Sequence, residues 1–456
     1  MLRSVDPTTG RFLESVPEYE PEQVSEALER STRAFEDWRW VDIEIRAKHL
    51  RRVAELLRED AERHALTMAL EMGKPIREGR AEIGKCAWVC DFYADQAAHF
   101  LHPEKIATDA VESWVQFDPL GPLLAVMPWN FPFWQVFRFA APALMAGNTA
   151  LLKHASNVPR CAESIERVFG CAGFPPGVLQ NLPLASNRLT GLVKSPHLRA
   201  VTLTGSEWAG QQLAAEAGCA LKKIVLELGG SDPFVVLDDV RIAQVAVQAA
   251  RARTLNSGQS CIAAKRFIVS ESILSPFIEA LQTELEALRV GDPREEITDV
   301  GPLARADLLD ALDGQVWDSI ERGATLVTGG SRIDRPGFFY APTLLCDVRP
   351  GMRVAEEETF GPVAAVMGFD DDDEAVAIAN GSRYGLGASV WSRDPERALS
   401  LAQRLEVGCV SINGIVRSDP RMPFGGTKQS GFGRELGREG IREFVNVKSV
   451  RIGEAA

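Results

Sequence analysis

The stretch Arg199–Gly218, RAVTLTGSEWAGQQLAAEAG, joins a short apolar strand to a helix through the turn Gly205-Ser206. Another apolar run, KKIVLELGG, follows directly at 222–230. Upstream, the strand-like runs LLAVM (123–127) and TALLK (149–153) are each followed by a turn. Short apolar strands that alternate with helices are typical of βαβ units. The sequence therefore predicts an α/β fold, with a parallel sheet covered by helices on both faces.

The chain is too long for a single hydrophobic core, and its alternation of strands and helices starts again after about Gly230. At 456 residues, two or three domains are expected. Helical periodicity dominates before residue 110, and a long helical pattern over 43–70 stops at Gly73 and Pro75. New apolar strands begin at DPFVVLDD (232–239) and continue to GCVSING (408–414), which predicts a second α/β domain after about Gly230.

Composition and charge exclude several classes of protein. A net charge of −13 argues against a nucleic-acid partner and against an anionic membrane surface. The N-terminus lacks the apolar core of a signal peptide, and the most apolar segment is too short to span a bilayer. The eight cysteines form no CxxC pair, and Cys86 and Cys90 are interpreted as core residues rather than metal ligands. We expect a cytoplasmic protein with free thiols and no bound metal.

The turn after the strand at 200–204 offers a place for a phosphate group. Glycines allow the backbone to approach a phosphate, and the N-terminus of the following helix favours negative charge. Gly205, Ser206 and Gly210 fit this description, but the GxGxxG fingerprint of dinucleotide-binding proteins is absent. An ordinary glycine turn before a helix fits these residues equally well.

Three further residues combine chemistry with an informative position. Asn130, in PWNFP (128–132), lies in a stiff turn after a buried strand, where its amide suits an oxyanion hole; a structural turn asparagine is the alternative. Glu227, in LELGG, ends a strand among apolar neighbours, where burial raises a carboxyl pKa toward that of a general base. The alternative for Glu227 is a structural carboxylate that caps nearby backbone N–H groups. Cys261, in NSGQSCIAAKR (256–266), has no histidine nearby in sequence, and lone cysteines are more often inert than catalytic.

The ordered set of motifs resembles the aldehyde dehydrogenase superfamily. PWNFP, TGS before a helix, LELGG, GQSC, EEETFGPV and PFGGTKQSGFGRE occur in that family's order between about Gly121 and Glu435. The resemblance implies that Cys261 is the nucleophile, Asn130 the oxyanion donor and Glu227 the general base. The thiolate would attack an aldehyde to give a thiohemiacetal, loss of hydride to a nicotinamide would give a thioester, and water activated by Glu227 would hydrolyse it.

The same resemblance implies a set of cofactor-binding residues. Lys153 would lie near the adenosine ribose, Ser206 and Trp129 near the pyrophosphate, and Glu358 and Phe360 at the nicotinamide ribose and ring. Gly205, Ser156 and Leu228 complete the set of residues expected at the cofactor.

The residue at position 156 bears on the choice of cofactor. NAD-preferring relatives carry a glutamate where this chain has Ser156, so a charge that would repel a 2′-phosphate is missing, and Lys153 is near to attract it. We expect NADP to be preferred and NAD also to be accepted. The alternative is that Ser156 is only a loop residue and that both cofactors work.

Within the superfamily, the chain is most similar to bacterial succinate-semialdehyde dehydrogenases that use NAD(P). Trp134, Arg138 and Ser418 match positions that line the substrate funnel of those enzymes. Arg138, on an otherwise apolar helix face, would pair with the distal carboxylate of a semialdehyde. An internal salt bridge is the alternative for Arg138. Other aliphatic or aromatic aldehydes remain alternative substrates, and a catalytically silent binding or structural homologue is the alternative from another class.

The resemblance also implies a domain organisation and an assembly. We expect a Rossmann-like cofactor-binding domain, a catalytic domain and a small oligomerisation element, over residues 1–110 with 122–230, 231–428, and 111–121 with 429–456, respectively. A strand exposed at the edge of the small element would pair with a second subunit, so a homodimer or homotetramer is expected.

Overall fold

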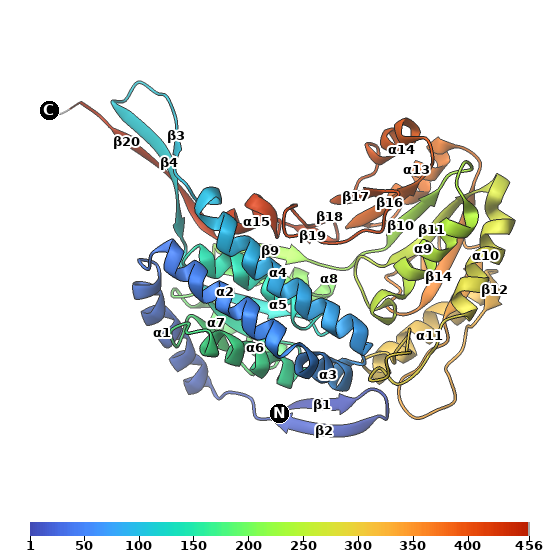
Figure 1. Ribbon diagram of the computed structural model, residues 1–456, viewed down its shortest axis with the longest axis horizontal. Helices are drawn as coiled ribbons and strands as arrows, with labels where there is room; N and C mark the ends of the chain where they lie inside the picture. The colour runs from blue at the N-terminus through green and yellow to red at the C-terminus, as the bar shows by residue number, and fades with distance from the viewer. Residues whose placement is uncertain (455–456) are drawn as a thin grey trace.

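A computed structural model describes residues 1–454 of the chain. Figure 1 shows two lobes of strands and helices, with a narrow arm of strands that projects from one of them. The first lobe is built around a six-stranded sheet and the second around a seven-stranded sheet. No helix within residues 1–454 has the length and apolar character that a membrane crossing requires.

The sheet of the first lobe is parallel apart from one short edge strand, and it confirms the predicted α/β fold. In spatial order its strands are β19 (Gly431–Phe432), β9 (Lys223–Glu227), β8 (Ala200–Thr204), β5 (Pro122–Met127), β6 (Thr149–His154) and β7 (Leu179–Asn181). The chain enters at β5, runs outward through β6 and β7, and returns on the other side of β5 with β8 and β9. The strand order therefore reverses between β5 and β8, where open α/β sheets leave a crevice for ligands.

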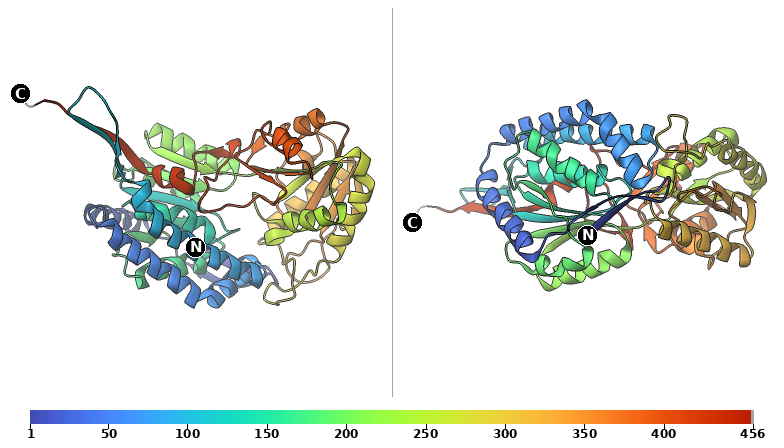
Figure 2. Two further views of the ribbon diagram at one scale, coloured as in Figure 1. Left: turned by 45° about the horizontal axis from the view of Figure 1, so that its top comes forward. Right: turned by 90° about the horizontal axis from the view of Figure 1, so that it is seen from below.

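Helices cover both faces of this sheet, as Figure 2 shows in its right-hand view. One face packs against α5 (Trp134–Met145) and α6 (Pro159–Cys171), with α2 (Ile43–Glu59), α3 (Ala61–Met72) and α4 (Ile76–Phe100) as a further layer. The other face packs against α1 (Pro21–Trp38), α7 (Thr190–Lys194) and α8 (Glu207–Cys219).

Helix α5 is buried along its whole length, which explains why its sequence is almost entirely apolar. A helix that is apolar on every side belongs in the interior of a large domain. The one ion in this helix, Arg138, therefore requires a partner of opposite charge inside the protein.

The second lobe carries a sheet that is parallel except at β12. Its strands in spatial order are β12 (Thr325–Thr328), β13 (Thr343–Cys346), β14 (Val363–Phe369), β11 (Ala264–Ser270), β10 (Asp232–Val236), β16 (Gly387–Trp391) and β17 (Cys409–Ile412). The longer helices of this lobe are α9 (Ile242–Thr254), α10 (Leu274–Glu286), α11 (Ala306–Glu321), α13 (Asp372–Asn380) and α14 (Pro395–Ala402). Helices α9 and α10 cover one face of the sheet, and α13 and α14 cover the other.

Short elements complete the two lobes. They are the hairpin β1 (Leu2–Asp6) with β2 (Arg11–Val16), the pair β15 (Tyr384–Gly385) with β18 (Thr427–Lys428), the helices α12 (Arg353–Glu356) and α15 (Gly437–Arg442), and the 3₁₀ turns η1 (Ser186–Arg188), η2 (Leu255–Gly258) and η3 (Glu271–Ile273). The hairpin contacts α3 and α6 of the first lobe.

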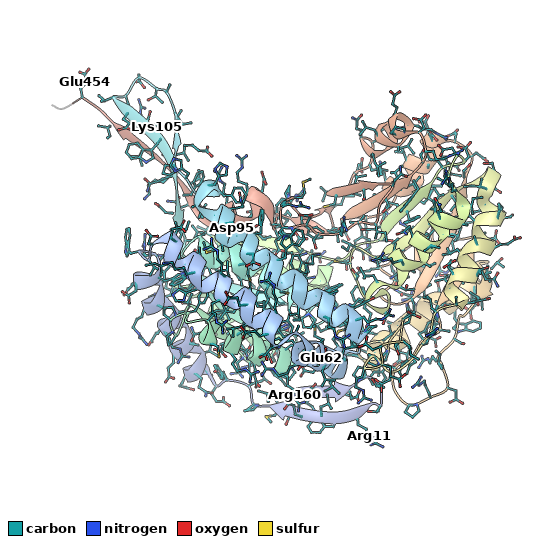
Figure 3. All side chains as sticks on the ribbon, viewed as in Figure 1. Arg11, Glu62, Asp95, Lys105, Arg160 and Glu454 are labelled. Atoms are coloured by element: carbon teal, nitrogen blue, oxygen red, sulfur yellow. The ribbon has the colours of Figure 1, made fainter. Side chains whose placement is uncertain are left out.

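The arm is a three-stranded antiparallel sheet made from distant parts of the chain. Its order is β20 (Val445–Ile452), β4 (Glu112–Pro119) and β3 (Glu104–Lys105). Lys105 lies on the arm and Glu454 at its outer end (Figure 3). Strand β20 forms one edge of this sheet, and most of its residues are exposed.

The structure differs from the sequence interpretation in three details. The pattern over 43–70 is two helices, α2 and α3, because Asp60 departs from helical geometry with φ −105° and ψ 16°. Strands β7 and β13 are only 3 and 4 residues long, too short for periodicity to predict them. Of the range 429–456, only β20 lies in the arm: β19 pairs with β9 in the first lobe, and α15 contacts α5 and α4.

Candidate active site

The loop that carries Cys261 has an unusual backbone. Asn256, Ser257 and Gly258 all have left-handed conformations, with φ of 55°, 57° and 76°. Such conformations are costly for residues with a side chain and persist only where neighbouring groups hold them. The Asn256 N–H donates to Glu78 Oε2 at 2.6 Å, and its side-chain Nδ2 donates to the carbonyls of Asn130 (2.7 Å) and Gln259 (2.9 Å). The strained turn is thereby tied to the PWNFP turn.

A buried lysine holds the other side of this loop. Lys265 Nζ donates to the carbonyls of Ser260 (2.9 Å), Cys261 (2.8 Å) and Ala263 (3.2 Å). Gly230 lies against the same loop, since a Cβ built there would be 2.6 Å from the Cys261 carbonyl oxygen. The second glycine of LELGG is therefore required for the close approach of the two segments.

Asn130 lies beside the cysteine loop and is oriented by it. Its Nδ2 donates to the Gln259 carbonyl at 3.2 Å, and the side chain is 4% exposed. An amide nitrogen carries two hydrogens, so one N–H of Asn130 remains. Within residues 1–454, the Cys261 backbone N–H also donates to no protein acceptor. Both N–H groups are therefore free to donate to an oxyanion, and the role of Asn130 as the oxyanion donor stays a prediction.

A buried ion pair positions the PWNFP turn. Glu82 accepts the backbone N–H groups of Phe133 and Trp134, both at 2.9 Å, at the start of α5, and it pairs with the fully buried Lys74. The Lys74 Nζ lies 3.8 Å from the centroid of the Phe131 ring. Negative charge at a helix N-terminus is favourable, so Glu82 fixes both the turn and the direction of α5.

The environment of Cys261 keeps its thiol protonated. Burial raises the pKa of Cys261 to about 12, the Arg138 guanidinium opposes this rise, and the Glu358 carboxylate adds to it. The Lys265 ammonium also lowers this pKa, and Asp232 raises it. The charges that act on the thiol are therefore chiefly Arg138, Glu358 and Lys265.

Glu227 ends β9 in a buried environment that contains charged groups, not only the apolar neighbours that its sequence suggested. It is 2% exposed, and its Oε1 has no hydrogen-bond partner within residues 1–454. Burial raises the pKa of Glu227 well above its usual value; Arg138 opposes this rise, and Glu435 adds to it. A carboxyl group with a raised pKa suits a proton acceptor.

Arg138 occupies a central position in the buried part of the site. It is 2% exposed and forms an ion pair with Glu435, and its guanidinium lies 4.7 Å from the centroid of the Phe424 ring. This ion pair is the internal salt bridge that the sequence left open as the alternative for Arg138. Its Nη2 has no hydrogen-bond partner within residues 1–454.

The other two residues expected at the substrate, Trp134 and Ser418, are in contact. Trp134 Nε1 donates to Ser418 Oγ at 3.1 Å, and both side chains are buried.

Cys86 and Cys90 are core residues of α4, where burial raises the pKa of both thiols. No group of three possible metal ligands occurs within residues 1–454.

A cavity of about 440 Å³ opens at the reversal of the strand order in the first-lobe sheet, with Cys261 in its wall. The predicted residues that line it are Trp129, Asn130, Lys153, Ser156, Gly205, Ser206, Leu228, Cys261, Glu358 and Phe360. Glu227, Trp134, Arg138 and Ser418 are not part of its lining. Ser186 and Arg305 also line the cavity, although neither belongs to a motif that the sequence pattern singles out.

One end of the cavity gathers a cation and several hydroxyl groups. Lys153, at the end of β6, donates from Nζ to Ser186 Oγ at 2.7 Å, and Ser156 is exposed nearby in the same lining. Burial lowers the pKa of Lys153 to about 8. Ser206 caps α8 by accepting the Ala209 N–H. A buried cation, hydroxyl donors and a helix N-terminus together suit phosphate groups.

The other end of the cavity carries a carboxylate and two aromatic rings. Glu358 accepts the Gly230 N–H at 3.0 Å and lies 3.7 Å from Lys265 Nζ. The rings of Trp129 and Phe360 meet edge to face with centroids 5.6 Å apart. A carboxylate that accepts from hydroxyl groups, next to aromatic walls, suits a sugar and a flat ring. The cavity therefore offers groups that suit a phosphate, a sugar and a flat ring, which are parts of a dinucleotide.

The raised pKa of Cys261 predicts a characteristic pH profile for its alkylation. Because only the thiolate reacts, and its fraction grows with pH below the pKa, the rate of carbamidomethylation should rise about tenfold per pH unit between about pH 7 and about pH 9. Mass spectrometry of the peptide that contains Cys261 measures this rate in the protein alone, and Cys261→Ser identifies the signal. A plateau within this range would contradict the raised pKa.

Known proteins share both the sequence and the fold. Residues 1–450 match the model of the aldehyde dehydrogenase family. The chain is 49% identical over 451 residues to the probable succinate-semialdehyde dehydrogenase (NADP(+)) of Synechocystis sp., with 99% of each chain covered. It is 45% identical to succinate semialdehyde dehydrogenase (NAD(P)+) Sad of Escherichia coli, covering 98% of this chain and 97% of that protein.

The structural likeness is equally extensive. The crystal structure of succinic semialdehyde dehydrogenase from Streptococcus pyogenes in complex with NADP+ superposes with a TM-score of 0.97 at 36% identity, covering 100% of both chains. The family model matches residues 1–450, and the chain carries the cysteine, asparagine and glutamate of the family motifs in the same order. This chain belongs to the aldehyde dehydrogenase family.

Proposed function

We propose that this protein oxidises succinate semialdehyde to succinate, with NADP as its preferred cofactor. The observation that carries the proposal is the placement of Cys261 in the wall of the cavity that the expected cofactor residues line, next to the free N–H donors of Asn130 and of its own backbone. The substrate is proposed from the relatives, because two proteins 45% and 49% identical to this chain are named for that activity.

In the first chemical step, Cys261 Sγ forms a bond to the aldehyde carbon, the π bond of the carbonyl breaks toward oxygen, and the thiol proton passes to solvent water. The carbonyl oxygen of the resulting thiohemiacetal becomes negative and is held by Asn130 Nδ2–H and the Cys261 N–H. Arg138 and Lys265 favour the thiolate that starts this step, because both lower the pKa of Cys261. The nicotinamide, when bound, supplies the acceptor for the hydride that leaves the thiohemiacetal carbon.

The remaining step is hydrolysis of the thioester on Cys261. Glu227 takes a proton from water, whose oxygen attacks the thioester carbon and releases the acid and the Cys261 thiol. The raised pKa of Glu227 increases its strength as a base, while Arg138 limits the rise. Glu227 is buried at the end of β9 and is not part of the cavity lining.

NADP fits one end of the cavity better than NAD does. Lys153, Ser156 and Ser186 can together bind a 2′-phosphate, and the hydrogen-bond partner of Lys153 Nζ is the Ser186 hydroxyl rather than a carboxylate. A phosphate beside Lys153 would keep the lysine protonated above pH 8, where burial alone would neutralise it. Glu358 and Phe360 would hold the nicotinamide ribose and ring.

The lobes and the arm support an assignment of domains and of an assembly. We assign cofactor binding to the first lobe and catalysis to the second, and we propose that the exposed edge of β20 pairs with another subunit in a homodimer or homotetramer. The eight cysteines are free, which fits the reducing cytoplasm that we propose as the location.

The substrate assignment predicts a preference between two aldehydes of equal length. With NADP, kcat/KM for succinate semialdehyde should exceed that for butanal by at least about thirtyfold, because only the semialdehyde offers a carboxylate for charge-assisted hydrogen bonds. The absorbance of the reduced cofactor measures both rates. An equal or higher value for butanal would contradict the substrate assignment and leave the chemistry of Cys261 standing.

The cofactor assignment predicts the effect of a negative charge at position 156. Ser156→Glu should raise KM for NADP at least about tenfold through repulsion of the 2′-phosphate, and should change KM for NAD much less. Ser25→Glu, an exposed serine on α1 outside the cavity, is the matched control and should change neither value. An equal effect of Ser156→Glu on both cofactors would show that Ser156 does not face the 2′ position.

A further inference from the structure

We propose that Lys85, on α4, binds the carboxylate of the substrate and sets the preference of this enzyme for an anionic aldehyde. The inference rests on the proposed function, because it identifies the group that would recognise the distal end of a semialdehyde. It adds a residue to the expected substrate set of Trp134, Arg138 and Ser418.

Lys85 is in direct contact with two of those residues. Its Nζ donates to Ser418 Oγ at 2.7 Å and lies 4.2 Å from the centroid of the Trp134 ring. Trp134 Nε1 donates to the same Ser418 oxygen at 3.1 Å. Three side chains from α4, α5 and the loop before residue 420 thus meet at one point.

This cluster contains donors that lack an acceptor. Ser418 Oγ already accepts two hydrogen bonds, so its own O–H can only donate. An ammonium has three N–H donors, and the bond to Ser418 is the one hydrogen bond that Lys85 Nζ makes within residues 1–454. A group that brings oxygen acceptors and a negative charge completes the cluster, and a carboxylate does both.

The charge of Lys85 is not neutralised by the protein. Within residues 1–454 no carboxylate lies in ion-pair distance of its Nζ. The acids that act on it, Glu82 and Asp419, have other partners: Glu82 pairs with Lys74, and Asp419 pairs with Arg421. Arg138, in contrast, is already paired with Glu435. Lys85 therefore offers a full charge to a carboxylate from outside, whereas the charge of Arg138 is shared with Glu435, although its Nη2 lacks a hydrogen-bond partner within residues 1–454.

Lys85 connects to the cysteine loop through Trp134, whose ring it contacts. Trp134 follows the turn that contains Asn130, and Asn130 Nδ2 donates to the carbonyl of Gln259, which precedes Cys261 in the cysteine loop. Burial brings the pKa of Lys85 down to about 8, which marks an ammonium that has lost water without gaining a counter-ion. A short aldehyde acid bound to Lys85 would extend past Trp134 toward Cys261.

The test compares kcat and KM for succinate semialdehyde and butanal in the NADP-loaded enzyme and its variants. Lys85→Met should lower the ratio of kcat/KM for semialdehyde over butanal by about thirtyfold or more, mainly through the KM for semialdehyde. Lys85→Arg keeps the charge and should retain most of the ratio. Removal of an unpaired, half-buried charge should not lower the melting temperature, and Lys85→Gln is a second neutral variant should Lys85→Met not fold.

Arg80→Met is the matched control, because Arg80 is a cation of the same helix that pairs with Glu62 and Glu296 away from the cluster. Glu62 lies on α3, in the outer helical layer of the first lobe (Figure 3). This variant should leave the ratio unchanged.

The outcomes separate the two proposals. A wild-type preference for semialdehyde that survives in Lys85→Met or Lys85→Gln would overturn the role of Lys85 and keep the proposed function. Equal losses for both aldehydes would also overturn it, because they would indicate a structural role. No preference in the wild-type enzyme would overturn both proposals.

Discussion

The ion pair between Arg138 and Glu435 is the interaction on which the chemistry of this site depends. Arg138 is the one charged residue of α5, a helix that is buried along its entire length. Glu435 follows the edge strand β19 in the sequence. Removal of one partner from a buried pair leaves an uncompensated charge, typically at a cost of about 3–5 kcal/mol. The pair therefore holds the C-terminal segment against the first lobe.

The same guanidinium acts on both reacting groups. It lowers the pKa of Cys261 and of Glu227, both of which burial raises. Burial is the larger effect at each group, so both pKa values stay raised and Arg138 limits the rise. One buried cation thus acts on the attacking group of the first step and on the base of the last step.

Backbone geometry does the remaining positioning. The left-handed run Asn256–Gly258 turns the chain so that Cys261 faces the cavity, and Glu78 and Lys265 hold this turn through hydrogen bonds. The PWNFP turn is held by Glu82 at the other side. The two turns meet where Asn130 Nδ2 donates to the Gln259 carbonyl, which brings an amide of the first lobe next to the loop that carries Cys261.

The sequence predicted the α/β fold and the residues of the cavity because these depend on local signals. Strand-turn-helix patterns identified the sheet, and motifs placed Cys261, Asn130, Lys153 and Glu358, which the structure brings together. Periodicity could not show the pairing of Arg138 with Glu435, since nearly 300 residues separate them (435 − 138). Lys85 was missed for the same reason: nothing in the surrounding helix indicates that its ammonium meets a serine on a distant loop.

The most direct test of the account is to trap the covalent intermediate on the enzyme. Glu227→Gln, in which hydrolysis is slowed, would be mixed with NADP and succinate semialdehyde, quenched in acid and digested, and the peptides analysed by mass spectrometry. The account predicts a succinyl thioester on the peptide that contains Cys261, and none in the same variant with Cys261→Ser. Cofactor reduction without an adduct on Cys261, or with the adduct on another cysteine, would contradict it.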